Sequence, residues 1–118
     1  MCSSDLGAKL NGMNDTVLDR LYQTIVSRRG TDAQQSYTAS LFARGHAHVA
    51  RKVGEEAMEA VIAAVEEDPK AIVSESADLL FHLLVLLADH GLKPEDVFAE
   101  LERREGTSGV TEKASRSR

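Results

Sequence analysis

The stretch from Leu79 to Ala88 is apolar at every position except His82. It lies in a segment that follows an Asp-Pro pair and stops before a glycine, and these end signals predict one helix over residues 69–90. A helix that is apolar nearly all round must be covered nearly all round. A chain of 118 residues has few other helices to cover it, so we predict a helical dimer with this helix at its centre.

Apolar residues at helical spacing predict the remaining helices. The first covers residues 16–28, and Asn14 or Asp15 can cap it. The next covers residues 46–67, and a short last helix starts at Pro94. The apolar stripe of the 46–67 helix consists of Val49, Val53, Ala57, Ala60, Val61 and Ala64. No strand pattern competes with these helices.

The predicted fold is therefore all-α, an antiparallel helical bundle of four to five helices that is completed by dimerisation. Residues 14–105 form the single domain. Residues 1–13 are polar and without periodicity, which predicts a disordered lead-in, and the polar residues 106–118 predict a flexible C-terminal tail. The stretch 33–43 is ambiguous, because Ser36-Tyr37-Thr38 fits a loop or a cap before a short helical turn.

Charge and cysteine content restrict the partners. The net charge is −5, which argues against a nucleic acid as the main partner because such binding depends on clustered Lys and Arg. No continuous apolar run has the roughly 18 to 20 residues of a membrane-spanning helix, and the first residues do not resemble a signal peptide. The single Cys2 cannot form an internal disulfide, so we expect a cytoplasmic protein.

Two acidic pairs carry the chemical information. Glu56 and Glu59 lie three apart on one predicted helix, and Glu75 and Asp78 lie three apart on the next, so each pair shares a helix face. At 100° per residue, Glu56 and Glu75 border the apolar stripes of their helices. Because the linker is short, the helices must pair antiparallel, which can bring the four carboxylates together.

Partly buried carboxylates that close to one another repel and need a cation. Mg²⁺ prefers oxygen ligands and retains waters that substrate phosphates can replace, so it would bind a triphosphate and help to activate the attacking water. Two alternatives stand beside this interpretation. Glutamates on helices are most often solvated surface, and a di-iron bundle also uses helical carboxylates, although it normally has Glu-x-x-His where this chain has Glu59 and Asp78.

The pattern E-E-x-x-E, fifteen residues, E-x-x-D resembles the signature of the all-α nucleotide triphosphate pyrophosphatase (MazG-like) superfamily. The chain is most similar to one member family, the phosphoribosyl-ATP pyrophosphatases, over about residues 16 to 110. The segments that carry this resemblance are Ser36-Tyr37-Thr38-Ala39, Lys52-Val53-Gly54-Glu55-Glu56, the apolar run from Ala77 to Leu87, and Arg104-Glu105-Gly106-Thr107-Ser108-Gly109.

The resemblance implies hydrolysis of phosphoribosyl-ATP to phosphoribosyl-AMP and pyrophosphate, the second step of histidine biosynthesis. It implies Mg²⁺ as cofactor, with Mn²⁺ as a substitute. The metal ligands that it implies are Glu56, Glu59, Glu75 and Asp78. Glu55 is a weaker candidate for the catalytic set, because its helical angle points away from the apolar stripe.

The resemblance also implies that substrate contacts come from Ser36, Tyr37, Thr38 and Lys52. The first three fit a helix cap equally well, and Lys52 fits an i, i+4 ion pair with Glu56 as well as a phosphate contact. His82 is expected to be a buried or interface residue rather than a ligand, and its place one turn after Asp78 would also let it orient that carboxylate. Two other functions remain open at this point: a house-cleaning pyrophosphatase for (deoxy)nucleoside triphosphates, and a non-catalytic helical dimerisation module.

Overall fold

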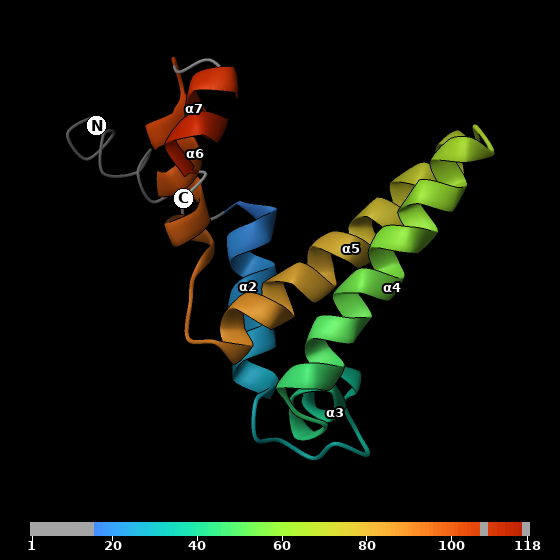
Figure 1. Cartoon of the computed structure of the whole chain (residues 1–118). Helices are drawn as coiled ribbons and strands as arrows, with labels where there is room; N and C mark the ends of the chain where they lie inside the picture. Colours follow the sequence, from blue (N-terminus) through green and yellow to red (C-terminus); the bar gives the residue numbers. More distant parts are fainter. Residues whose placement is uncertain (1–15, 107–108, 117–118) are drawn as a thin grey trace, which may run out of the picture.

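The computed structural model describes residues 16–106 and 109–116 of the chain, and every regular element in those ranges is a helix (Figure 1). The helices are α2 (Val17–Arg28), α3 (Tyr37–Ala43), α4 (His46–Val65), α5 (Pro69–Asp89), α6 (Pro94–Arg104) and α7 (Gly109–Arg116). The all-α prediction is confirmed. The predicted lead-in, residues 1–13, lies outside the described residues.

Local signals explain where the long helices begin and end. Asp68 accepts a hydrogen bond from the Ala71 amide at 3.2 Å and Pro69 occupies the first turn of α5, as predicted. Gly91, with φ at +71°, follows the end of the same helix. The cap of α2 is Thr16, which accepts from the Asp19 amide at 3.2 Å. The residues predicted to cap this helix, Asn14 or Asp15, lie outside the described residues.

The core forms at one end of a long helical hairpin. Helices α4 and α5 run antiparallel, and α2 and α3 pack against the end of the hairpin where α4 begins and α5 ends (Figure 1). The fully buried side chains are Ile25, Leu41, Val49 and Val85, one from each of these helices. The Tyr22 hydroxyl donates to the Leu92 carbonyl at 2.6 Å and fixes α2 to the loop before α6.

The other end of the hairpin projects away from this core, so its apolar residues stay exposed (Figure 1). Val61 is 53% exposed, Val65 76% and Val73 70%. In the predicted apolar stripe of α4, Val49 is buried, but Val61 and Ala64 are exposed. The other buried residue of α4 is Ala63, which was not part of the predicted stripe. Much of the apolar surface that the sequence pattern predicts to be buried is therefore exposed in a single chain.

Helix α5 is also long and apolar enough, by length and composition alone, to cross a membrane, with a mean hydropathy of 1.8 in its most apolar window. Polar residues interrupt this helix, so the sequence contains no unbroken apolar run of that length. The core helix of a water-soluble protein passes the same test, and α5 packs along α4 and carries Glu75 and Asp78. Only 28% of that window is buried within the chain.

The segment after α6 contains a helix that was not predicted, because its sequence is polar. Helix α7 covers Gly109–Arg116, within the segment 106–118 that was predicted to be a flexible tail. The flexibility of that segment stays a prediction.

Candidate active site

Three carboxylates from two helices meet on the α4–α5 hairpin. Glu56 comes from α4, and Glu75 and Asp78 come from α5, one turn apart. One carboxylate oxygen from each lies within 4.8 Å of the other two. Glu56 and Glu75 are partly buried, and Asp78 is exposed. The antiparallel pairing thus brings together three of the four carboxylates singled out from the sequence.

Burial and the neighbouring acids shift the pKa of Glu75. Its partial burial raises the pKa of Glu75, and the negative charges of Asp78, Glu59 and Glu56 raise that pKa further. A raised pKa means that the folded chain disfavours the ionised carboxylate. A bound cation would reverse this effect, because opposite charge nearby favours the ionised form.

Glu59 lies outside the group of three. It is one helical turn beyond Glu56 on α4 and its side chain is exposed. Its charge nevertheless raises the pKa of Glu75, so it lies within electrostatic reach of the cluster. The structure therefore places Glu59 at the edge of the cluster, and its role as a ligand stays a prediction.

Lys52 lies one turn before the cluster on α4. Its Nζ is 3.3 Å from Oε1 of Glu55 and 3.7 Å from Oε2 of Glu56. The hydrogen bond to Glu55 raises the pKa of Lys52, and Tyr37, Glu55 and Glu56 raise it further, against a lowering by desolvation. The ammonium group is thus positively charged at neutral pH and lies beside the carboxylates, where it can meet an anionic ligand.

Glu55 has a different environment from the three clustered acids. It is half exposed and pairs with two cations of its own helix, Arg51 at 3.6 Å and Lys52 at 3.3 Å. Such exposed pairs contribute only a few tenths of a kcal/mol. Its position agrees with the helical angle that pointed it away from the apolar stripe, and the structure does not bring it into the cluster.

Tyr37 joins the site through a histidine. Its hydroxyl is 2.8 Å from Nε2 of His82, and Nδ1 of that ring is 2.8 Å from the Asp78 carbonyl oxygen. A carbonyl oxygen only accepts, so Nδ1 donates, and in the neutral ring Nε2 accepts the Tyr37 proton. His82 is buried, and its ring makes edge contacts with Phe81 and Tyr37. The predicted segment around Tyr37 is therefore fixed to the helix that carries Asp78.

The neighbours of Tyr37 have separate positions. Ser36 caps α3, since its Oγ accepts from the Ala39 amide at 3.1 Å. Thr38 is partly buried in the first turn of the same helix. The cap is thus established for Ser36, and a substrate contact for either residue stays a prediction.

The link between Tyr37 and His82 was missed in the sequence analysis. The signal that could have found it is the single polar residue in the apolar run of α5, one turn after Asp78. A buried imidazole needs hydrogen-bond partners for both nitrogens. Its partner forty-five positions earlier could not be identified without the three-dimensional packing.

The sequence of the chain is similar to those of known proteins. The model of the phosphoribosyl-ATP pyrophosphohydrolase family matches residues 18–105. A phosphoribosyl-ATP pyrophosphatase of Azospirillum brasilense is 60% identical over 100 residues, which cover 85% of this chain and 90% of the relative. One of Parvibaculum lavamentivorans is 61% identical over 99 residues, 84% of this chain and 91% of the relative.

A third relative gives the same result. A phosphoribosyl-ATP pyrophosphatase of Paramagnetospirillum magneticum is 57% identical over 102 residues, which cover 86% of this chain and 94% of the relative. All three matches are nearly full-length for the relatives. The matched residues 18–105 include helices α3, α4 and α5, and with them the carboxylate cluster and Tyr37.

Proposed function

Because the chain belongs to the phosphoribosyl-ATP pyrophosphohydrolase family, it hydrolyses phosphoribosyl-ATP to phosphoribosyl-AMP and pyrophosphate in histidine biosynthesis, and we propose that it does so with Mg²⁺ held by Glu56, Glu75 and Asp78. The products are a monophosphate and pyrophosphate, so the anhydride between the α and β phosphorus atoms is the bond that breaks. The observation that carries the metal assignment is the convergence of the three carboxylates within 4.8 Å.

The donor atoms fit magnesium. Carboxylate oxygens are the ligands that Mg²⁺ prefers, and oxygens on opposite sides of the ion lie roughly 4 Å apart. Three oxygens within 4.8 Å of one another are close to that spacing. Mn²⁺, which takes similar ligands, is a substitute. When bound, the ion neutralises phosphate charge and acts as a Lewis acid toward the anhydride.

The chain's own groups supply the rest of the site. Glu59 is the fourth carboxylate in this proposal, since its charge already acts on Glu75. Lys52 contacts a phosphate oxygen of the triphosphate as a point charge, in exchange for part of its contact with Glu55. The exposed ring of Tyr37, fixed by His82, orients the substrate beside the carboxylates, with Ser36 and Thr38 next to it.

The partner that we propose is a second copy of the chain. The projecting end of the α4–α5 hairpin exposes large apolar side chains, and an apolar hollow of about 190 Å³ lies between α5 and α6, lined among others by Leu80, Leu83 and Phe98. Exposed apolar patches of this kind mark association surfaces. We further propose a cytoplasmic location, with which the single cysteine is compatible.

An assay of pyrophosphate release tests the function and the metal together. We expect Mg²⁺-dependent release from phosphoribosyl-ATP that exceeds release from each member of a panel of (deoxy)nucleoside triphosphates. Preference for a plain deoxynucleotide would indicate a house-cleaning enzyme, and no release from any nucleotide would indicate a binding module. Release that is unchanged in chelator would contradict the metal.

Matched variants connect the activity to the site. Glu56→Gln and Asp78→Asn should each lower kcat by at least about 100-fold, because each removes one charged ligand. Glu66→Gln is the control, an exposed glutamate at the end of the same helix, α4. Circular dichroism must show that the variants stay helical. Full activity in folded Glu56→Gln would rule out the assignment of that residue.

A further inference from the structure

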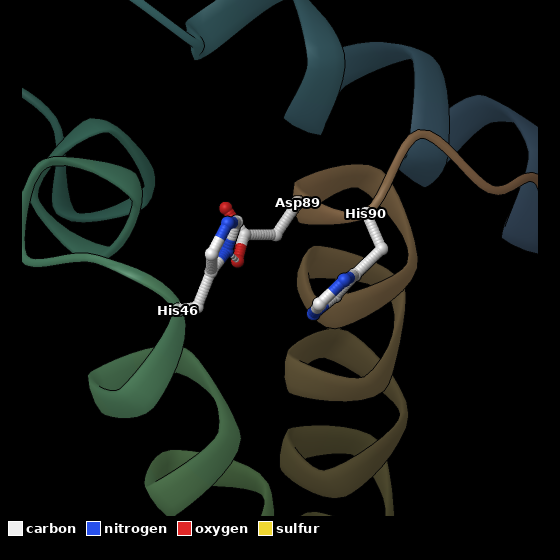
Figure 2. Close-up of side chains that lie close together, drawn as sticks. All are labelled: His46, Asp89 and His90. Atoms are coloured by element: carbon white, nitrogen blue, oxygen red, sulfur yellow. Dashed lines mark hydrogen bonds and ion pairs between the residues drawn. The ribbon is translucent and has the colours of Figure 1, made fainter.

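A second group of potential metal ligands lies at the core end of the hairpin (Figure 2). It consists of His46, the first residue of α4, Asp89, the last residue of α5, and His90, which caps α5. One ligand atom from each lies within 4.8 Å of the other two. We propose that these three residues form a binding site for a zinc-class transition-metal ion, separate from the carboxylate site and not needed for the proposed function.

The two sites are well separated. His46 is ten residues before Glu56 on α4, and Asp89 is eleven residues after Asp78 on α5. At 1.5 Å per residue, this spacing puts the two groups about 15 Å apart along the hairpin. No residue belongs to both groups, so the two can be tested independently.

Asp89 is a buried carboxylate that faces the two histidines. Its side chain is 3% exposed, and Oδ2 pairs with Nδ1 of His46, while Oδ1 lies 3.7 Å from the guanidinium of Arg29. Arg29 also donates to the Ala88 carbonyl oxygen at 2.9 Å. Buried carboxylates need a cationic partner. Arg29 holds one oxygen, and this leaves the other oxygen directed at the imidazoles.

The histidines make the site accessible. The His46 side chain is 68% exposed, and His90 is exposed as well, so an ion can enter from solvent. The two rings lie 4.8 Å apart between centroids and are inclined by 22°. Figure 2 shows His46 and Asp89 directed toward each other from the adjacent ends of α4 and α5, with His90 beside them.

The donor set selects the kind of metal. Two imidazole nitrogens and one carboxylate oxygen are ligands that zinc takes in sites with three protein ligands and one open position. Imidazole is a softer donor than carboxylate, so this site should prefer Zn²⁺ to Mg²⁺, the reverse of the all-oxygen cluster. The partial negative charge at the C-terminus of α5 is opposed by the partial positive charge at the N-terminus of α4, so the selection rests on the donor atoms. A bound ion would connect the start of α4 to the end of α5.

Zinc titration of the untagged, full-length protein tests the proposal. Calorimetry should show one Zn²⁺ per chain with micromolar or tighter affinity, and zinc should raise the melting temperature. His46→Gln and His90→Gln should each weaken binding at least tenfold, and both leave the contact of Asp89 with Arg29 in place. Three controls should bind as wild type: His48→Gln, Glu56→Gln in the carboxylate site, and Cys2→Ser. His48 is a partly buried histidine of α4 whose Nδ1 lies 3.1 Å from Nη2 of Arg51.

Chemical modification gives a second measurement that needs no variant. Zinc should protect His46 and His90 from diethyl pyrocarbonate, as read by mass spectrometry, and leave His48 reactive. The proposal is overturned if zinc does not bind, if binding survives the His46 and His90 substitutions, or if the Glu56 substitution abolishes it. Equal reactivity of His46, with and without zinc, would also overturn it.

Discussion

The Tyr37 hydroxyl donates to Nε2 of His82, 2.8 Å away, and the other nitrogen of that ring donates to the backbone carbonyl of Asp78. This chain of two hydrogen bonds connects the first residue of α3 to the carboxylate-bearing turn of α5. Tyr37 is 55% exposed, so the hydrogen bonds fix an aromatic residue that stays open to solvent.

Loss of the Tyr37 hydroxyl should therefore affect substrate binding more than folding. Tyr37→Phe removes one part-buried hydrogen bond, which should lower the free energy of unfolding by about 0.5–1.5 kcal/mol, and we expect a several-fold higher KM because the ring is no longer fixed. Urea denaturation and steady-state kinetics measure the two effects. Tyr22→Phe is the matched control, since its hydroxyl donates to Leu92 away from the site. It should lower stability and leave KM unchanged, and an equal change in KM would refute the role of Tyr37.

Neutralising Glu75 should stabilise the metal-free protein. Burial and the charges of Asp78, Glu59 and Glu56 raise the pKa of this acid, so the folded state is penalised by ionisation above the ordinary pKa. Glu75→Gln removes that penalty, and we expect a higher melting temperature at pH 7 in chelator. In Mg²⁺ the order should reverse, because only the wild-type protein gains stability from the ion. A variant that still gains the full increase with Mg²⁺ would show that Glu75 is not a ligand.

Both ends of α5 could be predicted from the sequence because Asp68, Pro69 and Gly91 act locally. Helical angles likewise indicated that Glu56 and Glu75 border the packed face, since an angle depends only on spacing along one helix. The exact register between α4 and α5 does not follow from spacing. It separates Glu59 from the group of three carboxylates.

Register also explains what the sequence did not reveal. The pairing of His46 with Asp89 joins residues 43 positions apart. It depends on the register in which α4 and α5 pack against each other. Burial is similar: the stripe of α4 predicts apolar contact, but a single chain covers Val49 and leaves Val61 exposed. The pattern marks which residues are apolar and does not say which surface covers each of them.

The ion pairs of Glu100 on α6 should contribute to the loss of stability at acid pH. Hydrogen bonds from Arg103 and Arg104 lower the pKa of Glu100 to about 2. A depressed pKa contributes stability above the ordinary value near 4.5, and that stability is lost as pH falls from there toward 2. Glu100→Gln should thus reduce stability at pH 7, slightly because the pair is exposed, and flatten the loss between pH 4.5 and 2. Melting temperatures across that range measure it. Glu102→Gln on the same helix should keep the wild-type slope.

The exposed apolar face of α5 gives the most direct test of the dimer. Leu80 is 46% exposed in the single chain and lines the apolar hollow between α5 and α6. If a second copy covers it, Leu80→Glu buries a charge without a partner, which is strongly unfavourable. We expect the dissociation constant to rise at least 100-fold, equivalent to about 2.8 kcal/mol, and sedimentation at micromolar concentration to show monomers. Val17→Glu, at a position 67% exposed on α2, should sediment as the wild type does. A wild-type protein that is monomeric at these concentrations would refute the dimer, and a dimer that persists in Leu80→Glu would move the interface off this face.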